Sequence, residues 1–319
     1  MELRGVRFRN VINASGARGF FGEGYAFHKF FRPFGLDYNG STFVGKTTTL
    51  PATKGNMPLK DDFTPKEFKP KCIVVKLGHG STLNAVGLSG PGSAALINCG
   101  YWQQFKESFF ISWMSTDHDR QGRIDEFRAV LRQLIHYHSQ FKAKFGLKIN
   151  VSCPNVGLNT AILSNDVGAY LEAPELADLD WMPIVFKFNL FAPVTVVAEC
   201  AEHPRFSGAC WANTTPWKDL PDDIKLKVFG SVTSPLSHLG GGGFSGPQMR
   251  PKLLEVAKEA KEIKFPKPIY FGTGIYSVDD AREVLAAGPQ QSGISLGTIS
   301  IHRPLSVQKI IRFVNDHTS

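Results

Sequence analysis

Short runs of apolar, β-branched and aromatic residues alternate along this chain with longer amphipathic segments. The apolar runs predict strands at about residues 72 to 77, 108 to 114, 147 to 152, 183 to 188, 208 to 212, 268 to 272 and 293 to 297. Apolar residues recur with helical spacing over residues 124 to 145, 250 to 263, 277 to 288 and 306 to 315. Because strands that alternate with helices build a parallel sheet covered by those helices, the pattern predicts an α/β fold.

The chain is long enough for one large domain. It has 319 residues, 42% of them hydrophobic, and it contains neither an internal repeat nor a low-complexity linker, so residues 1–319 are interpreted as a single domain. No apolar run is long enough to span a bilayer, and the N-terminal residues do not resemble a signal peptide, which favours a soluble, cytoplasmic protein with no membrane partner. Five cysteines without metal-type spacing indicate reduced thiols and no metal site.

The charge balance is basic, with 36 Lys and Arg residues against 28 Asp and Glu residues and a formal net charge of +8. The basic residues are scattered, with a loose concentration between Lys54 and Lys71. A scattered pattern favours a solvated basic surface over a nucleic-acid interface. The overall field of such a protein would still favour an anionic cofactor and an anionic substrate.

The segment Ile149–Asn155 places two amides and one thiol where a predicted strand gives way to a turn. The carboxamides of Asn150 and Asn155 each offer an acceptor and two donors, a set suited to the edges of a cyclic imide. The thiol of Cys153 has an ordinary pKa near ~8.5, close enough to neutral for a general base. A lone cysteine is more often a small buried apolar residue, so this segment alone leaves both interpretations open.

Further polar motifs follow predicted strands along the whole chain. In order they are Asn13–Gly16, Gly45–Thr49, Asn84–Leu88, Val185–Asn189, Ala212–Thr215, Gly242–Pro247, Gly272–Ile275 and Gly297–Thr298. Together with the Asn-x-Ser-Cys-Pro-Asn segment, this series resembles the dihydroorotate dehydrogenase family, FMN-dependent barrel enzymes of pyrimidine synthesis. The resemblance implies a (β/α)8 TIM barrel of parallel strands with FMN at its C-terminal mouth, where residues distant in sequence converge.

Carried over position by position, the resemblance assigns a substrate clamp. It implies that four asparagines bind the orotate ring and carboxylate, with Thr214 beside them and Lys46 over the flavin and substrate; the asparagines are Asn84, Asn150, Asn155 and Asn213. Cys153 would act as the catalytic base, with Lys46 in the catalytic set. Asparagine is also common in turns, which is the structural alternative for each position.

The same comparison assigns the cofactor site. Lys46 and Lys187 each end an apolar run, where a buried ammonium needs a partner, and the anionic edge of a reduced flavin would provide one for Lys187. The resemblance implies that Ala14, Ser15 and Gly16 pass along the flavin ring. The remaining cofactor contacts that we expect are Thr47, Asn84, Asn150, Thr214, Gly243, Gly272, Thr273, Gly274, Gly297 and Thr298.

The expected reaction is the oxidation of dihydroorotate to orotate in de novo UMP synthesis. Cys153 would remove the C5 proton while the C6 hydride passes to flavin N5. With cysteine at the base position, the chain resembles the soluble class of the family. Members of that class use fumarate, or NAD through an iron-sulfur flavoprotein subunit. The Gly242–Pro247 motif favours the NAD branch. A homodimer is implied by the resemblance alone.

Two other functions remain open from the sequence. One is a related FMN barrel oxidoreductase that acts on another dihydropyrimidine or cyclic enone. The other is a non-catalytic flavin-binding subunit of a larger assembly, for which a retained base has no use. The segment from Thr214 to Gly241, rich in Pro, Asp and Lys, is expected to leave the barrel above its mouth.

Overall fold

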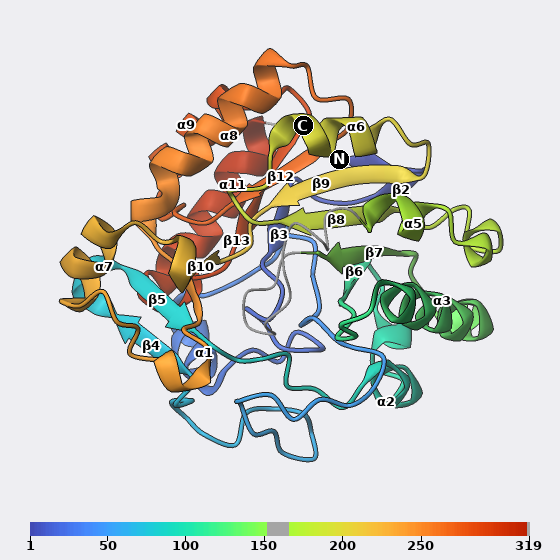
Figure 1. Cartoon of the computed structure of the whole chain (residues 1–319), viewed down its shortest axis with the longest axis horizontal. Coiled ribbons are helices and arrows are strands. Elements are labelled where there is room, and N and C mark those ends of the chain that lie inside the picture. Colours follow the sequence, from blue (N-terminus) through green and yellow to red (C-terminus); the bar gives the residue numbers. More distant parts are fainter. Residues whose placement is uncertain (152–165, 318–319) are drawn as a thin grey trace.

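The computed structural model describes residues 1–151 and 166–317 of the chain. Within these ranges, seven parallel strands form one curled sheet (Figure 1). In spatial order they are β3 (Val11–Asn13), β13 (Ser292–Leu296), β12 (Ile269–Gly272), β9 (Phe206–Trp211), β8 (Ile184–Phe188), β7 (Phe145–Asn150) and β6 (Phe109–Trp113). Six of the seven strands coincide with predicted runs to within two residues, which confirms the parallel α/β prediction.

Residues 42–48 close this sheet into a barrel, because they bridge its two edge strands. Parallel bridges join Thr42 to Ile12 beside β3, and Val44 to Phe110 in β6. The Asn13 side chain fixes the same junction, since its Nδ2 donates to Val44 O at 2.7 Å and its Oδ1 accepts from Val44 N at 2.9 Å. The eighth position of the barrel is therefore an irregular segment, which supports the TIM-barrel prediction.

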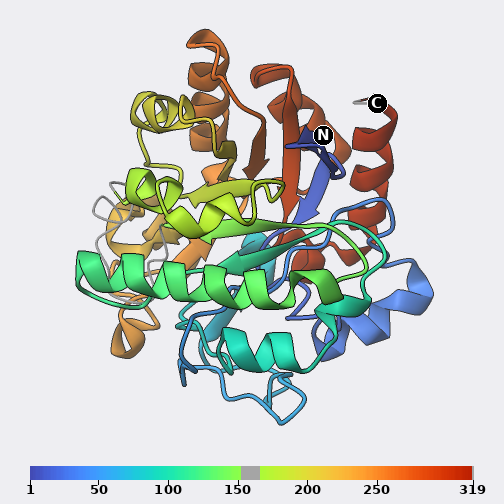
Figure 2. The ribbon, with the colours of Figure 1, turned by 90° about the vertical axis from the view of Figure 1, so that its right-hand side faces the viewer.

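Helices lie outside the sheet, as Figure 2 shows for α3 in front of the barrel. They are α2 (Ser93–Asn98), α3 (Arg120–Tyr137), α5 (Val167–Leu171), α6 (Val194–Ala201), α8 (Arg250–Glu262), α9 (Val278–Ala287) and α11 (Val307–His317). Helix α9 begins where the sequence predicts, because Ser277 Oγ accepts from Asp280 N at 3.1 Å. Among the described residues, no helix is both long and apolar enough to cross a membrane.

The helix predicted over residues 124 to 145 is wrong at both ends. It begins at Arg120, where Asp119 caps it by accepting from Gly122 N at 3.1 Å, and it ends at Tyr137. Phe145 already belongs to β7, and Phe141 is extended, with its ring 4.6 Å from that of Phe145. Phe141 and Phe145 pack against each other after the helix has ended, and their spacing of four residues is also typical of neighbours on one face of a helix.

A second sheet lies beside the barrel mouth, and we call it the roof sheet. Its strands are antiparallel, in the order β10 (Thr215–Pro216), β11 (Gly243–Ser245), β5 (Ser81–Asn84) and β4 (Ile73–Lys76). The run at residues 72 to 77 was therefore wrongly placed in the parallel series. Only residues 77–80 separate β4 from β5, too few for a crossover between parallel strands.

The roof sheet also accounts for the segment from Thr214 to Gly241. This segment leaves the barrel after β9, forms β10 and α7 (Asp222–Phe229), and returns to β11, which pairs with β5. Trp217 lies at the start of this excursion, and its ring is 5.0 Å from that of Phe229. The expected excursion above the barrel mouth is thus a second contribution to the roof.

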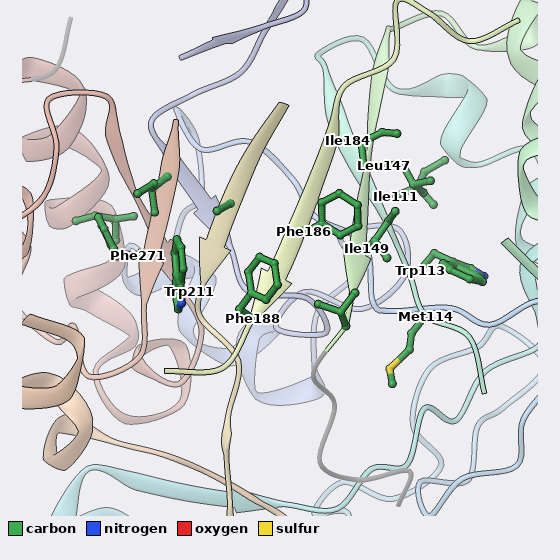
Figure 3. Packing of buried hydrophobic residues seen from close by; sticks show 14 of the residues in the cluster. Ile111, Trp113, Met114, Leu147, Ile149, Ile184, Phe186, Phe188, Trp211 and Phe271 are labelled. Carbon is green, nitrogen blue, oxygen red and sulfur yellow. The ribbon is translucent and has the colours of Figure 1, made fainter. Parts of the chain in front are cut away.

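The buried apolar residues form two clusters. The larger one lies between strands and helices and includes Trp113, Ile149 and Phe186 (Figure 3). The smaller one fills the inside of the barrel, and we call it the floor cluster: Leu3, Val6, Phe8, Ile12, Val44, Phe110, Val185, Cys210 and Tyr270. Its first members come from the N-terminal hairpin of β1 (Glu2–Leu3) and β2 (Val6–Arg7), which packs into the barrel interior. The barrel is therefore a packed core rather than a pore.

Candidate active site

A cavity of about 800 Å3 lies between the C-terminal ends of the barrel strands and the roof sheet. The barrel side contributes Asn150 at the end of β7, Lys187 near the end of β8, and the residues that directly follow β3, β9, β12 and β13. The roof side contributes Thr82 and Asn84 of β5 and Ser245 of β11. The cavity therefore lies at the face of a parallel barrel where active sites are built.

Three of the four predicted asparagines line this cavity. Asn150 and Asn213 are each 4% exposed, and Asn213 Nδ2 donates to Asn150 Oδ1 at 3.0 Å. Asn213 Oδ1 accepts from Thr214 N at 3.0 Å, so the orientation of the Asn213 amide is fixed on both sides. Asn84 approaches from the roof, where its Nδ2 donates to Gly243 O at 3.3 Å. Amide groups from two barrel strands and the roof thus face one space.

The fourth predicted asparagine, Asn155, and the predicted base, Cys153, lie outside the described residues. Asn150 is the last residue of β7 and lines the cavity, and Val151 directly follows it. The described part of the chain therefore ends beside the cavity. In the sequence, Cys153 follows the cavity-lining Asn150 by three residues.

Two buried lysines also line the cavity. Lys46 and Lys187 are each 7% exposed. The ammonium of Lys46 donates to Ser89 O and lies 4.9 Å from the centre of the Phe20 ring. Two ammonium groups in a largely water-excluded space create a positive potential that favours an anionic ligand.

Short hydroxyl contacts join the segment after β3 to the neighbouring strands. Ser15 Oγ donates to Ser112 Oγ at 3.0 Å, and Ser112 Oγ is 2.9 Å from Thr47 Oγ1. Gly16 has φ 86°, a value that favours glycine, and its backbone faces the Lys46 stem. Residues 14–16 therefore present bare backbone and small side chains to the cavity next to Lys46.

A second tight stretch of backbone lines the cavity after β12 and β13. Thr273 and Gly274 have φ values of 74° and 73°, and a Cβ on Gly274 would lie 3.0 Å from Arg250 N. A Cβ on Gly297 would lie 2.9 Å from Ala14 Cβ. Thr273 Oγ1 is buried without a hydrogen-bond partner among the described residues. A buried polar atom of this kind in a cavity wall suits a polar ligand.

Two predicted cofactor residues do not line the cavity. Gly272 packs strands together, because a Cβ there would lie 2.6 Å from Ala212 Cβ. Gly243 pairs with Asn84 in the roof sheet and accepts its side-chain hydrogen bond. The other described residues of the predicted set all line it: Ala14, Ser15, Gly16, Lys46, Thr47, Asn84, Asn150, Lys187, Asn213, Thr214, Thr273, Gly274, Gly297 and Thr298.

Sequence reasoning missed an apolar wall of the same cavity. Its residues come from the region around α1 (Ala26–Phe31) and from β4 with its flanks: Tyr25, Phe27, Phe31, Phe68, Pro70, Ile73, Val75 and Leu77. Burial raises the pKa of Tyr25 to about 12, so its hydroxyl stays protonated at neutral pH. The dense aromatic run between Phe20 and Phe34 was the available sequence signal for this wall.

The family assignment follows from comparison with known proteins. A family model described as dihydroorotate dehydrogenase matches residues 1–317. Dihydroorotate dehydrogenase A (fumarate) of Lacticaseibacillus paracasei is 28% identical over 324 residues, covering 97% of this chain and 94% of the relative. The catalytic subunit of dihydroorotate dehydrogenase B (NAD(+)) of Bacillus pumilus is 26% identical over 318 residues, covering 98% of this chain and 88% of the relative.

A solved structure supports the fold. The ligand-free crystal structure of the enzyme from Eimeria tenella superimposes with a TM-score of 0.67, covering 99% of this chain and 86% of that chain at 17% identity. Since the family model extends over nearly all of the barrel and the roof sheet, the chain belongs to the dihydroorotate dehydrogenase family.

Proposed function

We propose that this protein oxidises dihydroorotate to orotate in pyrimidine biosynthesis, with FMN as its resident cofactor. Its family consists of oxidoreductases that are flavoenzymes. The observation that carries the proposal is the convergence of amides and ammonium groups on one cavity, namely Asn84, Asn150, Asn213, Lys46 and Lys187. Dihydroorotate combines a cyclic imide with a carboxylate, and these are the groups that amides and cations bind.

The walls of the cavity suit FMN in three places. Residues 14–16 offer bare backbone for a flat ring, and Lys187 offers a cation for the anionic edge of the flavin. The tight backbone at Thr273, Gly274, Gly297 and Thr298 offers amides that can approach a phosphate. Gly243 and Gly272 would support this site through packing. When bound, FMN supplies the hydride acceptor at flavin N5.

The chain's own residues would hold and deprotonate the substrate. The hydrogen bond between Asn213 and Asn150 sets the orientation of both amides before a ligand arrives, which reduces the ordering cost of binding. Asn155 and Thr214 would complete the clamp, and Lys46 would hold the substrate from above. Cys153, as a thiolate, would remove the C5 proton, because a thiol with a pKa slightly above neutral is an effective general base.

Reoxidation would use an acceptor of the soluble class. Relatives named for fumarate and for NAD(+) match this chain at 28% and 26% identity, respectively. We propose either fumarate or NAD as the acceptor, the latter through an iron-sulfur flavoprotein subunit, and a homodimer as the assembly. Addition of fumarate, of NAD with a partner subunit, or of a quinone to the reduced enzyme identifies which compound restores the oxidised flavin.

The first experiment is anaerobic mixing of the purified protein with dihydroorotate while the visible flavin absorbance is followed. Rapid bleaching is expected. A bound flavin that stays oxidised would contradict the dihydroorotate proposal and favour another cyclic substrate or a non-catalytic role. Release of the flavin by mild denaturation and measurement of its mass test whether the cofactor is FMN, independently of the substrate.

A further inference from the structure

The apolar wall of the cavity continues onto the protein surface. Phe31 lines the cavity, its ring is 5.2 Å from that of Phe30, and the Phe30 ring is 5.6 Å from that of Phe34. Phe30 and Phe34 are 66% and 62% exposed. Both residues stand at or just after the end of α1, so one face of this short helix points into the cavity and the next points to solvent.

A second part of the cavity wall is also both apolar and exposed. Phe68 and Leu77 line the cavity and are 67% and 74% exposed, and Val75 of β4 is 39% exposed. Figure 1 draws α1 next to β4 and β5, in agreement with their shared cavity. We call the exposed apolar residues of this wall and its continuation at α1 the rim: Phe68, Val75 and Leu77, which line the cavity, and Phe30 and Phe34, which continue outward from cavity-lining Phe31. Exposed aromatic groups gathered in this way mark a contact surface.

The rim is interleaved with positive charge. Residues 26–34 and 68–75 contain four basic residues and no acidic ones: Lys29, Arg32, Lys69 and Lys71. All four are exposed. Lys76, the next basic residue along β4, lies on the other face of the roof sheet, where its Nζ is 5.5 Å from the centre of the Phe229 ring of α7. Glu67, directly before the second stretch, is half-buried and accepts a hydrogen bond from Lys71 N at 2.9 Å. The rim therefore presents aromatic groups within a local excess of cations.

We propose that the rim docks onto the surface of an anionic lipid bilayer. Phenylalanine side chains that stand out from a short helix can enter the boundary between headgroups and acyl chains, while lysines beside them contact anionic headgroups. This is peripheral contact, distinct from a spanning segment. The proposal does not rest on the proposed reaction, because it concerns the outside of the molecule.

Composition favours a bilayer over a protein partner. Lysine is depleted in protein-protein interfaces, yet three of the four cations here are lysines. A second copy of this chain would bring four further cations against the same surface, and like charges in contact oppose such a pairing. An anionic bilayer is the occupant that satisfies both the aromatic groups and the cations.

Sedimentation with sucrose-loaded vesicles tests the proposal. We expect wild-type protein to sediment with phosphatidylcholine vesicles that contain phosphatidylserine at about 30 mol%, and to stay in solution with phosphatidylcholine alone. Binding should fall when salt is raised from about 0.1 M to about 1 M, since the Debye length shrinks from about 10 Å to about 3 Å.

Two variants separate the aromatic and the charged contributions. Phe30→Ser/Phe34→Ser should abolish sedimentation without changing net charge. Lys29→Gln/Lys71→Gln should weaken it roughly 25-fold, since each cation near an anionic surface contributes roughly fivefold. The matched control is Val196→Ser/Ile263→Ser, because these apolar side chains on α6 and at the end of α8 are 41% and 38% exposed away from the rim. The control should bind like wild type.

Three results would overturn the proposal. These are equal binding to neutral and anionic vesicles, binding by the Phe30→Ser/Phe34→Ser variant at the wild-type level, and vesicle-free self-association, seen by light scattering, that the same variant removes. The last result would assign the rim to a contact between copies of this chain. Because vesicle binding is measured without substrate, failure here is distinguishable from failure of flavin reduction.

Discussion

The floor cluster and the cavity are built on the same strands, yet they differ in every chemical respect. Val185 and Lys187 are two residues apart on β8, and Val44 and Lys46 are two apart in the closing segment. Inward-facing positions of a strand recur every second residue, about 7 Å along the chain. Within that one step the barrel interior changes from packed apolar side chains to amides and ammonium groups. The same strands therefore contribute apolar side chains to the core at one level of the barrel and polar side chains to the cavity at the next level.

The largest expected effect comes from emptying the floor. Phe110 is fully buried, and its ring stacks 4.2 Å from that of Phe8 and lies 6.4 Å from that of Tyr270. Phe110→Ala should lower the free energy of unfolding by about 3 to 5 kcal/mol, measured by denaturant titration. Flavin reduction in the protein that remains folded should keep its wild-type rate. A loss below about 1 kcal/mol would show that the floor is not a close-packed core.

The reverse outcome is expected for Cys153, the proposed base. Cys153→Ala should leave FMN bound and the thermal midpoint unchanged, while anaerobic flavin reduction slows roughly 10²-fold or more. Cys210→Ala is the matched control, because the Cys210 thiol is buried in the floor cluster and should not affect the rate. Fast reduction in the Cys153 variant would show that another group takes the proton.

A pH effect should arise in α1, next to the cavity wall, rather than in the floor. His28 of α1 is 2% exposed, and burial lowers its pKa to about 4 from an ordinary value near 6.5. A buried histidine that stays neutral when folded stabilises the protein above the unfolded pKa, and this contribution is lost as the pH falls from about 6.5 toward 4. Protonation would also disrupt the bond that His28 Nδ1 accepts from Tyr25 N at 3.2 Å.

His28→Gln should flatten this dependence. Between pH 7 and pH 4.5, wild type should lose about 2 kcal/mol more stability than the variant, by denaturant titration at each pH. Other acidic groups titrate over the same range in both proteins, so the difference between the two curves is the quantity that reports on His28. Parallel curves would exclude His28 as the source.

The smallest expected effect removes one hydrogen bond from the floor. Tyr270 OH donates to Arg9 O at 3.0 Å. Tyr270→Phe should cost about 1 kcal/mol of stability, measured by denaturant titration, and should leave flavin reduction unchanged. Tyr276→Phe is the comparison at the mouth, where Tyr276 OH donates to Gly80 O at 2.6 Å beside β5. If the Tyr270 variant slowed the reaction, the floor and the cavity would be coupled and the separation between them would fail.

Periodicity predicted the parts of the fold that depend on local pattern. The strands that carry Asn150 and Lys187 coincide with apolar runs in the sequence. The start of α9 is predicted by the capping side chain of Ser277. The convergence of Asn84, Asn150 and Asn213 was expected from the family resemblance, because a barrel brings the ends of distant strands together.

Long-range pairing was not predictable in the same way. β10 has two residues and β11 three, too short for an apolar pattern, and the partner of β11 lies at Ser81–Asn84, far back in the chain. The irregular segment 42–48 carries Lys46 and Thr47 but pairs through isolated bridges rather than a regular strand. An apolar run also does not reveal its direction of pairing, which is why Ile73–Lys76 was misplaced.

The roof strands form a sheet of their own, and this separation affects how members of this enzyme family can diverge. In the described ranges the roof strands pair only with one another, while Lys187 and Asn150 belong to strands of the barrel. Insertions or exchanges in the excursion between β10 and β11 can therefore reposition Asn84, through its bond to Gly243, without resetting barrel register. With the residue roles proposed above, selectivity for the ring to be oxidised can change while the cofactor contacts made by the barrel strands are retained.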